Sequence, residues 1–495
     1  VVDLCGVNLA KQMHVGHLRS TVIGDALARV FARLGHDVKR QNHLGDWGLP
    51  IAMVVNAVRF AVERNALDLG ALTLDDLDRI YRAAQRECDA DRKGLAAVER
   101  FGLGPKAEAE LQEQVRGADE AIARAKHTLV ALQSGDPATV RLWERIAGVT
   151  LDECLAVCAR LHADVRPEHT AGESSYRDEL ADIVQDLESR GVAVESDGAL
   201  VVPLKDEGIE QPLLVRKGDG GFLYATTDLA GIRRRVQTLG ADRAVYAVDA
   251  RQSLHFKQVF AAATKAGYAR TRRGEDAALV HAAFGTILGE DNRPFKTRSG
   301  ENVRLSALLD EAVERALAAV RERNPDLPEP EKRAIAESVG VAAIKYADLS
   351  GDRVKDYVFN FDRMLAFEGD TGPYLLYALV RTRSISRKAQ ERFGDADTAA
   401  AAPFIVEAPE EKTLALALLR YRGALNAVAE SCEPHRLCAY AYDLANAFSA
   451  FFAACPVLQA PDEGARLARL RLCALTARTL EDALHTLGLP TLERM

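Results

Sequence analysis

Two histidines and a glycine lie in the tetrapeptide His14–His17 (HVGH), which follows a short apolar segment and precedes a helical pattern. Apolar residues from Leu18 to Leu34 recur at helical spacing, and Gly35 ends the pattern. The unpaired N–H groups at a helix start attract anionic oxygens, and imidazoles add donors to phosphates. Gly16 lets a flat base approach the backbone. The segment predicts a site for a nucleotide triphosphate. The alternative is that the histidines only cap a helix or fill a core, which would give the same sequence motif.

Further polar residues surround the end of this predicted first strand. Asp3, Asn8 and Lys11 lie within 15 residues of the two histidines. A carboxylate and an amide beside a lysine and imidazoles offer partners for both a cation and a polyphosphate. The alternative is that Asp3 and Lys11 are simply solvated.

A second group of polar residues lies far downstream. Tyr224 and Asp228 are four residues apart, hence on one face if the segment is helical, and Gln252 and His255 follow. A phenol, a carboxylate and a carboxamide suit a guanidinium, which has five donors in a fixed fork. A helix cap at Asp228 and a structural tyrosine are the alternative.

A third group combines glycines, hydroxyls and cations. Gly285–Gly289 precedes Phe295–Gly300, which contains Lys296, and such a loop can close over phosphates. The run Arg233–Arg235 could bind nucleic acid, but cations are favourable at a helix end, so a solvated face is expected. Aromatic and arginine residues of the C-terminal helices, from Tyr374 to Phe452, suit either single-stranded RNA or a core.

The composition is that of a globular protein of several domains. The chain has 495 residues, 48% hydrophobic and 27% charged, which predicts two to four domains. The sequence contains no uninterrupted apolar run of about 18 residues, so no membrane span is expected. Asp3 and Lys11 argue against a signal peptide, and because the chain begins without methionine inside a predicted strand, we expect it to lack an N-terminal piece. The net charge of −8 means that local basic patches must meet any nucleic acid.

The eight cysteines are scattered along the chain. Cys154 and Cys158 are one helical turn apart and could be half of a metal site, but no second pair or histidine pair completes it. We therefore expect reduced, mostly buried thiols, no metal-ligating residues, and a cytoplasmic location.

Strand and helix patterns predict an α/β fold. It is a Rossmann-type doubly wound parallel sheet split by a mostly helical insertion, followed by an all-α C-terminal domain. The predicted units are residues 1–56 (first half of the sheet domain), 57–198 (insertion), 199–325 (second half, with the lysine loop) and 326–495 (helical domain). The proline-rich stretch Asn324–Pro330 marks the last boundary.

Taken together, these motifs resemble the arginyl-tRNA synthetases, a family of class I aminoacyl-tRNA synthetases, over essentially the whole chain. Asn8–Thr21 is similar to the family signature, and His43–Gly48, Tyr224–Asp228 and Gln252 with His255 are similar to further motifs. Arg471–Arg478 is similar to part of the anticodon-binding helical domain. The resemblance implies ATP-dependent joining of arginine to its tRNA through an arginyl-adenylate.

The resemblance also implies roles for individual residues. Phe295–Ser299 lies where class I enzymes carry Lys-Met-Ser-Lys-Ser, and Lys11 shares the role of the lysine missing from that motif. Implied partners are L-arginine, ATP as substrate, Mg²⁺ and arginine tRNA, with no membrane, for a chain expected to be a monomer. The implied catalytic residues are Lys11, His14, His17 and Lys296. The implied arginine-binding residues are Asp3, Asn8, His14, Tyr224, Asp228 and Gln252. The implied ATP-binding residues are His14, Gly16, His17, Gly45, Asp46, Gly48, His255 and Lys296.

The chain departs from the family pattern in two places. Leu4–Val7 stands where Ser-Ser-Pro is usual before Asn8, which affects the expected turn geometry. The family's N-terminal domain, which binds the tRNA elbow, is not in the sequence, so weaker tRNA binding is expected in a filter-binding comparison with a full-length form.

Two other functions remain: a paralogue that adenylates arginine or another amino acid for a non-tRNA acceptor, and a non-catalytic tRNA-binding regulator. The helical C-terminal third argues against the first, and the retained histidines and lysines argue against the second.

Overall fold

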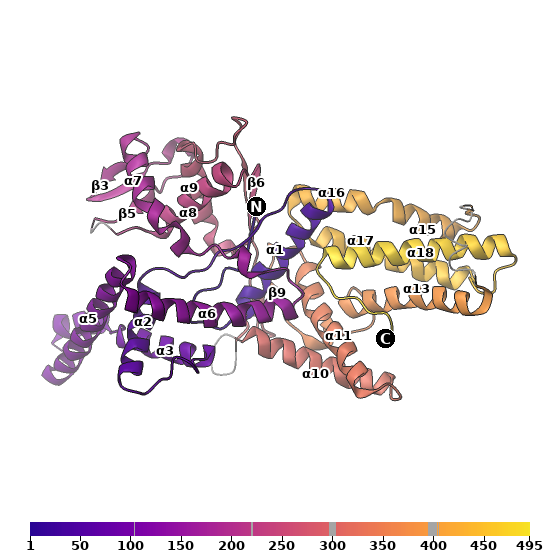
Figure 1. The fold of residues 1–495 in the computed structure, drawn as a ribbon, viewed down its shortest axis with the longest axis horizontal. Coiled ribbons are helices and arrows are strands. Elements are labelled where there is room, and N and C mark those ends of the chain that lie inside the picture. Colours follow the sequence, from indigo (N-terminus) through magenta and orange to yellow (C-terminus); the bar gives the residue numbers. More distant parts are fainter. Residues whose placement is uncertain (103, 219–220, 297–302, 395–402, 404) are drawn as a thin grey trace.

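A parallel sheet lies at the centre of the computed structural model, which describes residues 1–102, 104–218, 221–296, 303–394, 403 and 405–495 (Figure 1). The strand order is β2-β1-β6-β7, and every neighbouring pair is parallel. The sheet is built from two distant parts of the chain, which confirms the predicted doubly wound sheet split by an insertion. Its strands are β1 (Val2–Leu4), β2 (Arg40–Asn42), β6 (Arg243–Tyr246) and β7 (Ala278–His281).

The helix predicted after the tetrapeptide is α1 (Val15–Arg33), and it packs against β1. Gly24 lies where the two elements touch, because a Cβ added there would be 2.3 Å from the Cβ of Leu4. A glycine at this position therefore permits the close approach of helix and strand. This approach fixes the direction in which the N-terminus of α1 points.

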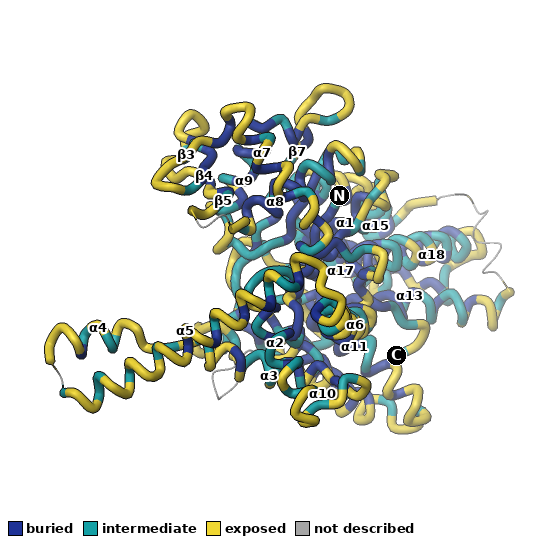
Figure 2. Tube along the Cα trace, turned by 60° about the vertical axis from the view of Figure 1, so that its left-hand side comes forward, coloured by how far each residue is buried: buried dark blue, intermediate teal, exposed yellow. Residues whose placement is uncertain are grey.

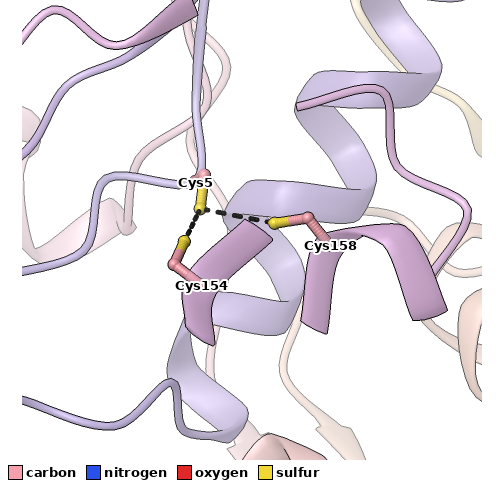
Figure 3. A group of neighbouring side chains, drawn as sticks. All are labelled: Cys5, Cys154 and Cys158. Atoms are coloured by element: carbon pink, nitrogen blue, oxygen red, sulfur yellow. Dashed lines mark hydrogen bonds between the residues drawn. The ribbon is translucent and has the colours of Figure 1, made fainter. Parts of the chain in front are cut away.

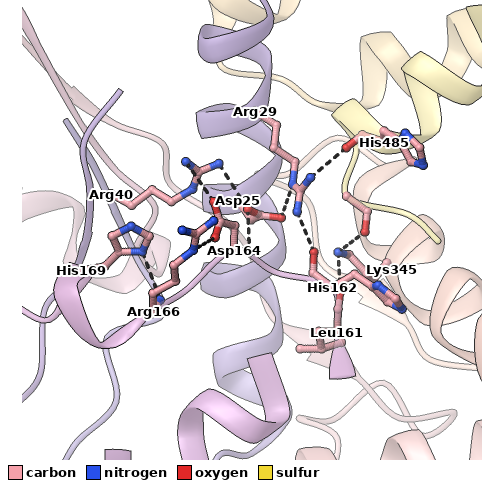
Figure 4. Close-up of polar contacts among 11 residues, drawn as sticks. Asp25, Arg29, Arg40, Leu161, His162, Asp164, Arg166, His169, Lys345 and His485 are labelled. Atoms are coloured by element: carbon pink, nitrogen blue, oxygen red, sulfur yellow. Dashed lines mark hydrogen bonds and ion pairs between the residues drawn. The ribbon is translucent and has the colours of Figure 1, made fainter. Parts of the chain in front are cut away.

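Buried polar contacts hold α1 to the rest of the protein (Figure 4). Asp25, fully buried on α1, accepts a hydrogen bond from Arg29 at 2.8 Å and one from the backbone N–H of Asp164 at 3.1 Å. The buried Lys345 donates to the carbonyls of Leu161 (2.6 Å) and Gly488 (2.5 Å). Burial lowers the pKa of Lys345 to about 8. These contacts join α1, the end of the insertion and the C-terminal segment.

The insertion is mainly helical, as predicted. Figure 2 shows that α4 and α5 extend away from the body as an arm with a largely exposed surface. The turn predicted at Gly135–Pro137 separates α5 from α6. The predicted unit boundary between residues 56 and 57 falls inside α2. The helices are α2 (Leu49–Glu63), α3 (Leu74–Glu87), α4 (Arg92–Phe101), α5 (Pro105–Gln133), α6 (Pro137–Arg160), α7 (Leu180–Ser189) and the 3₁₀ helices η1 (Pro167–His169) and η2 (Glu173–Glu179).

A second, antiparallel sheet with strand order β3-β4-β5 lies outside the parallel sheet. The sequence predicted its second and third strands but placed them with the parallel sheet domain. Their buried residues join those of α7, α8, α9 and the parallel strand β6 in one hydrophobic cluster. These elements are β3 (Val194–Ser196), β4 (Ala199–Val202), β5 (Leu213–Arg216), η3 (Lys205–Glu207), α8 (Tyr224–Arg233), the π-helical turn η4 (Arg234–Thr238), η5 (Ala250–Gln252) and α9 (Ser253–Lys265).

The C-terminal third is helical, as predicted, and its long helices form the bundle on the right of Figure 1. Phe448 and Phe451 are fully buried there, so these aromatic residues belong to the core. No helix among the described residues has the length and apolarity needed to cross a membrane. The remaining elements are β8 (Ile287–Leu288), β9 (Tyr357–Val358), α10 (Leu305–Arg323), α11 (Glu329–Leu349), α12 (Phe361–Met364), α13 (Gly372–Phe393), α15 (Pro409–Leu419), α16 (Tyr421–Ser431), α17 (His435–Ala454) and α18 (Glu463–Thr486).

Candidate active site

The tetrapeptide lies at the N-terminus of α1, as predicted. His14 is the N-cap, and its Nδ1 accepts a hydrogen bond from the backbone N–H of Gly16 at 3.0 Å. The Nδ1 of His17 accepts one from the backbone N–H of His14, also at 3.0 Å. Because both Nδ1 atoms are acceptors, each neutral ring carries its proton on Nε2, where it can donate to a ligand. The two rings lie side by side, with centroids 4.0 Å apart.

Both imidazoles are neutral at physiological pH. Burial lowers the pKa of His17 to about 3, and the charges of His14 and Lys11 act in the same direction. Burial and Lys11 also lower the pKa of His14. The histidines therefore offer hydrogen bonds to an anionic ligand, whereas positive charge must come from elsewhere.

Asn8 lies in the loop that follows β1, and the backbone of this loop lies beside Gly45. The backbone N–H of Leu9 donates to the carbonyl of Gly45 at 3.1 Å, and the N–H of Gly45 donates to Val7 at 3.0 Å. A Cβ added at Gly45 would lie 2.0 Å from the Oδ1 of Asn8. A side chain at position 45 would thus displace the Asn8 carboxamide, which explains why glycine is needed there.

Lys11 lies against the insertion. Its Nζ is 4.4 Å from the ring centroid of Tyr81 on α3. Gln12 and Arg304 both contact the Oδ1 of Asp75, at 2.6 and 2.7 Å. The helix α3 is therefore tied to the segments on both sides of the tetrapeptide.

The segment that follows the lysine loop returns to the tetrapeptide. The backbone N–H of Val15 donates to the carbonyl of Val303, and that of Leu305 donates to Met13, both at 2.9 Å. Lys296 itself is exposed. Thr297, Arg298 and Ser299, which the sequence also placed in the loop, lie outside the described residues.

The downstream group gathers around α8 and α9. The Oδ2 of Asp228 lies 2.6 Å from the Nε2 of His255, a contact that the sequence motifs did not indicate. Tyr224 begins α8 with an exposed side chain, and Gln252 ends η5 and is exposed. This group therefore combines a carboxylate hydrogen-bonded to an imidazole with two accessible polar side chains.

Glu173 is a site residue that the sequence analysis missed. It is buried at the start of η2, and its backbone N–H donates to the carbonyl of Leu44 at 3.0 Å. Burial raises the pKa of Glu173 to about 8, and Asp46 and Asp228 add to the rise. Burial and Glu173 also raise the pKa of Tyr224. The triplet Gly172–Ser174 lay within a stretch interpreted only as helical insertion, so no local signal identified this acid.

Asp46 positions the segment that carries Glu173. Its carboxylate accepts hydrogen bonds from the backbone N–H (2.8 Å) and the hydroxyl (2.6 Å) of Ser174. Its backbone carbonyl accepts one from Trp143 at 2.9 Å. Both carboxylate oxygens of Asp46 therefore accept hydrogen bonds within the protein. Gly48, two residues further on, is the N-cap of α2.

Asp3 is paired with an internal arginine. Its Oδ2 accepts a hydrogen bond from Arg235 at 2.6 Å, and the Nε of Arg235 donates to Gln41 at 2.5 Å. Arg235 is 2% exposed, so the expectation of a solvated arginine run was wrong for this residue. Arg233 and Arg234 both contact Glu179. The run forms ion pairs because α8 packs against η2 and η4 packs against β6, the neighbour of β1, which local sequence does not reveal.

We expect Arg235→Lys to lower the free energy of unfolding by about 1–3 kcal/mol, because one ammonium cannot replace a fork that binds two acceptors. Urea denaturation would measure the change. Arg251→Lys is the matched control, since the Arg251 side chain is 82% exposed beside Asp249 and its ion pair contributes little. Equal losses in the two variants would contradict the assigned role of Arg235.

Comparison with known proteins places the chain among proteins of similar sequence and fold. The family model for the catalytic domain of class I (R) tRNA synthetases matches residues 1–361, and the DALR anticodon binding domain model matches residues 375–495. An arginine–tRNA ligase of Pseudomonas syringae pv. tomato is 46% identical over 100% of this chain and 79% of its own length. The corresponding protein of Azotobacter vinelandii is 47% identical, with the same coverage of both chains.

Two solved structures share the fold. The arginyl-tRNA synthetase of Plasmodium falciparum has a TM-score of 0.79 at 27% identity, covering 100% of this chain and 76% of the other. The Thermus thermophilus arginyl-tRNA synthetase has a TM-score of 0.76 at 28% identity, covering 100% and 83%.

Proposed function

Because the chain belongs to the arginyl-tRNA synthetase family of class I aminoacyl-tRNA synthetases, we propose that it joins L-arginine to its cognate tRNA at the expense of ATP. The observation that carries this proposal is the acidic group of Asp228 and the buried Glu173, which are close enough to raise the pKa of Glu173, and Glu173 in turn raises the pKa of Tyr224. Two carboxyl groups and a phenol supply the acceptors that a guanidinium requires. The match of residues 375–495 to an anticodon-binding domain supports a tRNA acceptor over a non-tRNA acceptor.

In the first step, a carboxylate oxygen of arginine attacks the α-phosphorus of ATP, and pyrophosphate leaves. The neutral His14 and His17 donate from Nε2 to phosphate oxygens on which charge develops, while Lys11 and Lys296 supply positive charge. Asn8 and Gln252 hold the amino-acid end through their carboxamides. Catalysis comes mainly from positioning and charge stabilisation.

Mg²⁺ enters with ATP as part of the substrate. The carboxylates of Asp46 and Asp228 are already engaged by Ser174 and His255, so they do not form a cage of free oxygen ligands. Phosphate oxygens would hold the ion.

In the second step, a hydroxyl of the terminal adenosine of the tRNA takes the arginyl group and AMP leaves.

Arginine-dependent exchange of pyrophosphate into ATP, with and without arginine tRNA, tests this proposal against its two rivals. The expected result is exchange that depends on arginine and is increased by the tRNA. A full rate of exchange that is the same with and without arginine tRNA would favour an adenylating paralogue. No exchange under either condition would favour a tRNA-binding regulator.

The pH dependence of arginine binding tests the role of Glu173. A bound guanidinium favours the carboxylate form of Glu173. Because burial raises the pKa of Glu173 to about 8, this side chain is protonated below that pH, and arginine must displace the proton in order to bind. The dissociation constant for arginine should therefore fall by roughly tenfold between about pH 6.5 and 8 and then level off. Isothermal titration calorimetry across this range would measure it.

Glu173→Gln should bind arginine more weakly at pH 8 and show a nearly flat profile over the same range. Glu168→Gln is the control, because Glu168 is an exposed acid of η1 in the same part of the insertion. A pH profile of Glu173→Gln that matches the unmodified chain would contradict this role.

The chain is proposed to act as a monomer in the cytoplasm. Its cysteines are all free, and seven of the eight are buried, as the sequence predicted. Thiols that persist in this form suit a reducing compartment. Light scattering after size-exclusion chromatography checks the oligomeric state, and a mass near twice 53.9 kDa would contradict a monomer.

A further inference from the structure

Three cysteines meet beside the candidate active site, in the turn where the chain departs from the family sequence (Figure 3). The Sγ of Cys5 lies 3.6 Å from that of Cys154 and 3.9 Å from that of Cys158. All three sulfur atoms lie within 4.8 Å of one another and are buried. Within the described part of the chain, this is the one group of three or more His, Cys, Asp or Glu side chains close enough to share a metal ion.

The sequence analysis found only half of this cluster. Cys154 and Cys158 are one turn apart on α6, so their side chains share a face. The sequence analysis found no second pair or histidine pair to complete it, and the structure adds a single third thiol, Cys5, which lies 149 residues before Cys154 in the sequence. The third thiol reaches α6 only through the fold, at the end of β1.

The backbone holds Cys5 in its position. Its φ is +70°, in the left-handed region that residues other than glycine rarely adopt. The neighbouring N–H of Gly6 donates to Asn42 at 3.2 Å, and the N–H of Ala10 donates to Thr150 of α6 at 3.1 Å. The bond to Asn42 fixes the turn to the end of β2, and the bond to Thr150 fixes the segment after the turn to α6.

The sulfur spacing fits a tetrahedral metal ion. A Zn²⁺–S bond of about 2.3 Å places two sulfurs of a tetrahedron about 3.8 Å apart. The two separations from Cys5, 3.6 and 3.9 Å, lie on either side of this value, and the third pair lies within 4.8 Å. A disulfide needs sulfurs about 2.05 Å apart, so its formation would require a shift of roughly 1.5 Å. Soft thiolate ligands also select Zn²⁺ over hard cations.

We infer that Cys5, Cys154 and Cys158 bind one Zn²⁺ ion. Each thiol that coordinates the metal releases its proton to solvent, so three thiolates and Zn²⁺ leave one net negative charge. A water molecule would complete the tetrahedral coordination. The ion would fasten the turn that leads into Asn8 to helix α6 of the insertion.

This attachment has a consequence for the substrate, which rests on the proposed function. Asn8 is three residues from Cys5, so loosening the turn should move its carboxamide relative to the acidic group. Removal of the metal should therefore raise the KM for arginine several-fold more than the KM for ATP. Metal binding itself does not depend on this activity.

The test begins with the unmodified chain. It is purified under reducing conditions, and its metal content is measured by inductively coupled plasma mass spectrometry. The chelated protein is then titrated with Zn²⁺ or Co²⁺ alone. One ion per chain and an intense thiolate-to-cobalt charge-transfer band are expected. No bound metal, or a chain isolated with a disulfide between Cys5 and Cys154, would overturn the inference.

Single variants locate the ion. Cys154→Ser and Cys158→Ser should lose the cobalt band, while Cys473→Ser, a buried cysteine of α18, should keep it. Equal loss in Cys473→Ser would place the ion elsewhere. A normal cobalt band together with no arginine-dependent exchange would contradict the proposed function but not the metal site.

Discussion

Replacing Asp228 with alanine is expected to raise the KM for arginine by about 10²–10³-fold and the KM for ATP by less than about threefold. The carboxylate is half-buried on α8, close to the buried Glu173, and its loss removes a charged partner of the guanidinium. Removing one partner of a buried charge pair costs about 2–5 kcal/mol, and about 1.4 kcal/mol corresponds to a tenfold change in affinity.

The contact between Asp228 and His255 makes the comparison of the two substrates informative. His255 is implied in ATP binding, so an Asp228 that acts through His255 would raise both KM values together. Asp228→Asn keeps the shape and removes the charge, and it should reproduce the effect on arginine. Asp206→Ala, which removes an exposed acid paired with Lys265, should leave both values unchanged. Parallel increases in both KM values for Asp228→Ala would contradict the assignment.

We expect His17→Ala to lower kcat of pyrophosphate exchange by about 10²–10³-fold, the range found when one donor to a developing oxyanion is removed. The ring donates as a neutral group, because its pKa is lowered to about 3. Activity of the unmodified chain should accordingly not fall as the pH rises from about 6 to 8 through the usual pKa of histidine. Steady-state exchange kinetics at several pH values would measure both effects.

His36→Ala serves as the control, because His36 is exposed just after the end of α1. Circular dichroism of His17→Ala should retain the helical signal, since the helix keeps its N-cap at His14. A decline in activity with the titration of an ordinary histidine would instead indicate that an imidazolium is required.

The sequence predicted those parts of the site that depend on local patterns. Helical spacing after His14–His17 predicted α1, and apolar strands alternating with helices predicted the parallel sheet. The signature residues Asn8 and Gly45 meet as neighbours because both follow the ends of adjacent parallel strands, β1 and β2. Such placement follows from the topology of the sheet alone.

Buried polar groups that depend on distant contacts were not predicted. Asp3 and Arg235 are 232 residues apart, and only the packing of η4 against β6, the neighbour of β1, makes an apparently solvated arginine the partner of Asp3. Glu173 becomes an unusual acid because Asp46 holds η2 against the end of β2. In the antiparallel sheet, β3 was not predicted, since all of its three residues are exposed and give no pattern of burial.

Transfer of labelled arginine to tRNA tests the central claim most directly. The chain is incubated with ATP, Mg²⁺, labelled arginine and purified arginine tRNA, and acid-precipitable label is counted. We expect label to approach about one arginine per cognate tRNA, to require ATP, and to be absent with labelled lysine, since acceptors left unpaired discriminate by roughly 10⁴-fold. Arginine-dependent pyrophosphate exchange without any label on the tRNA would contradict the account.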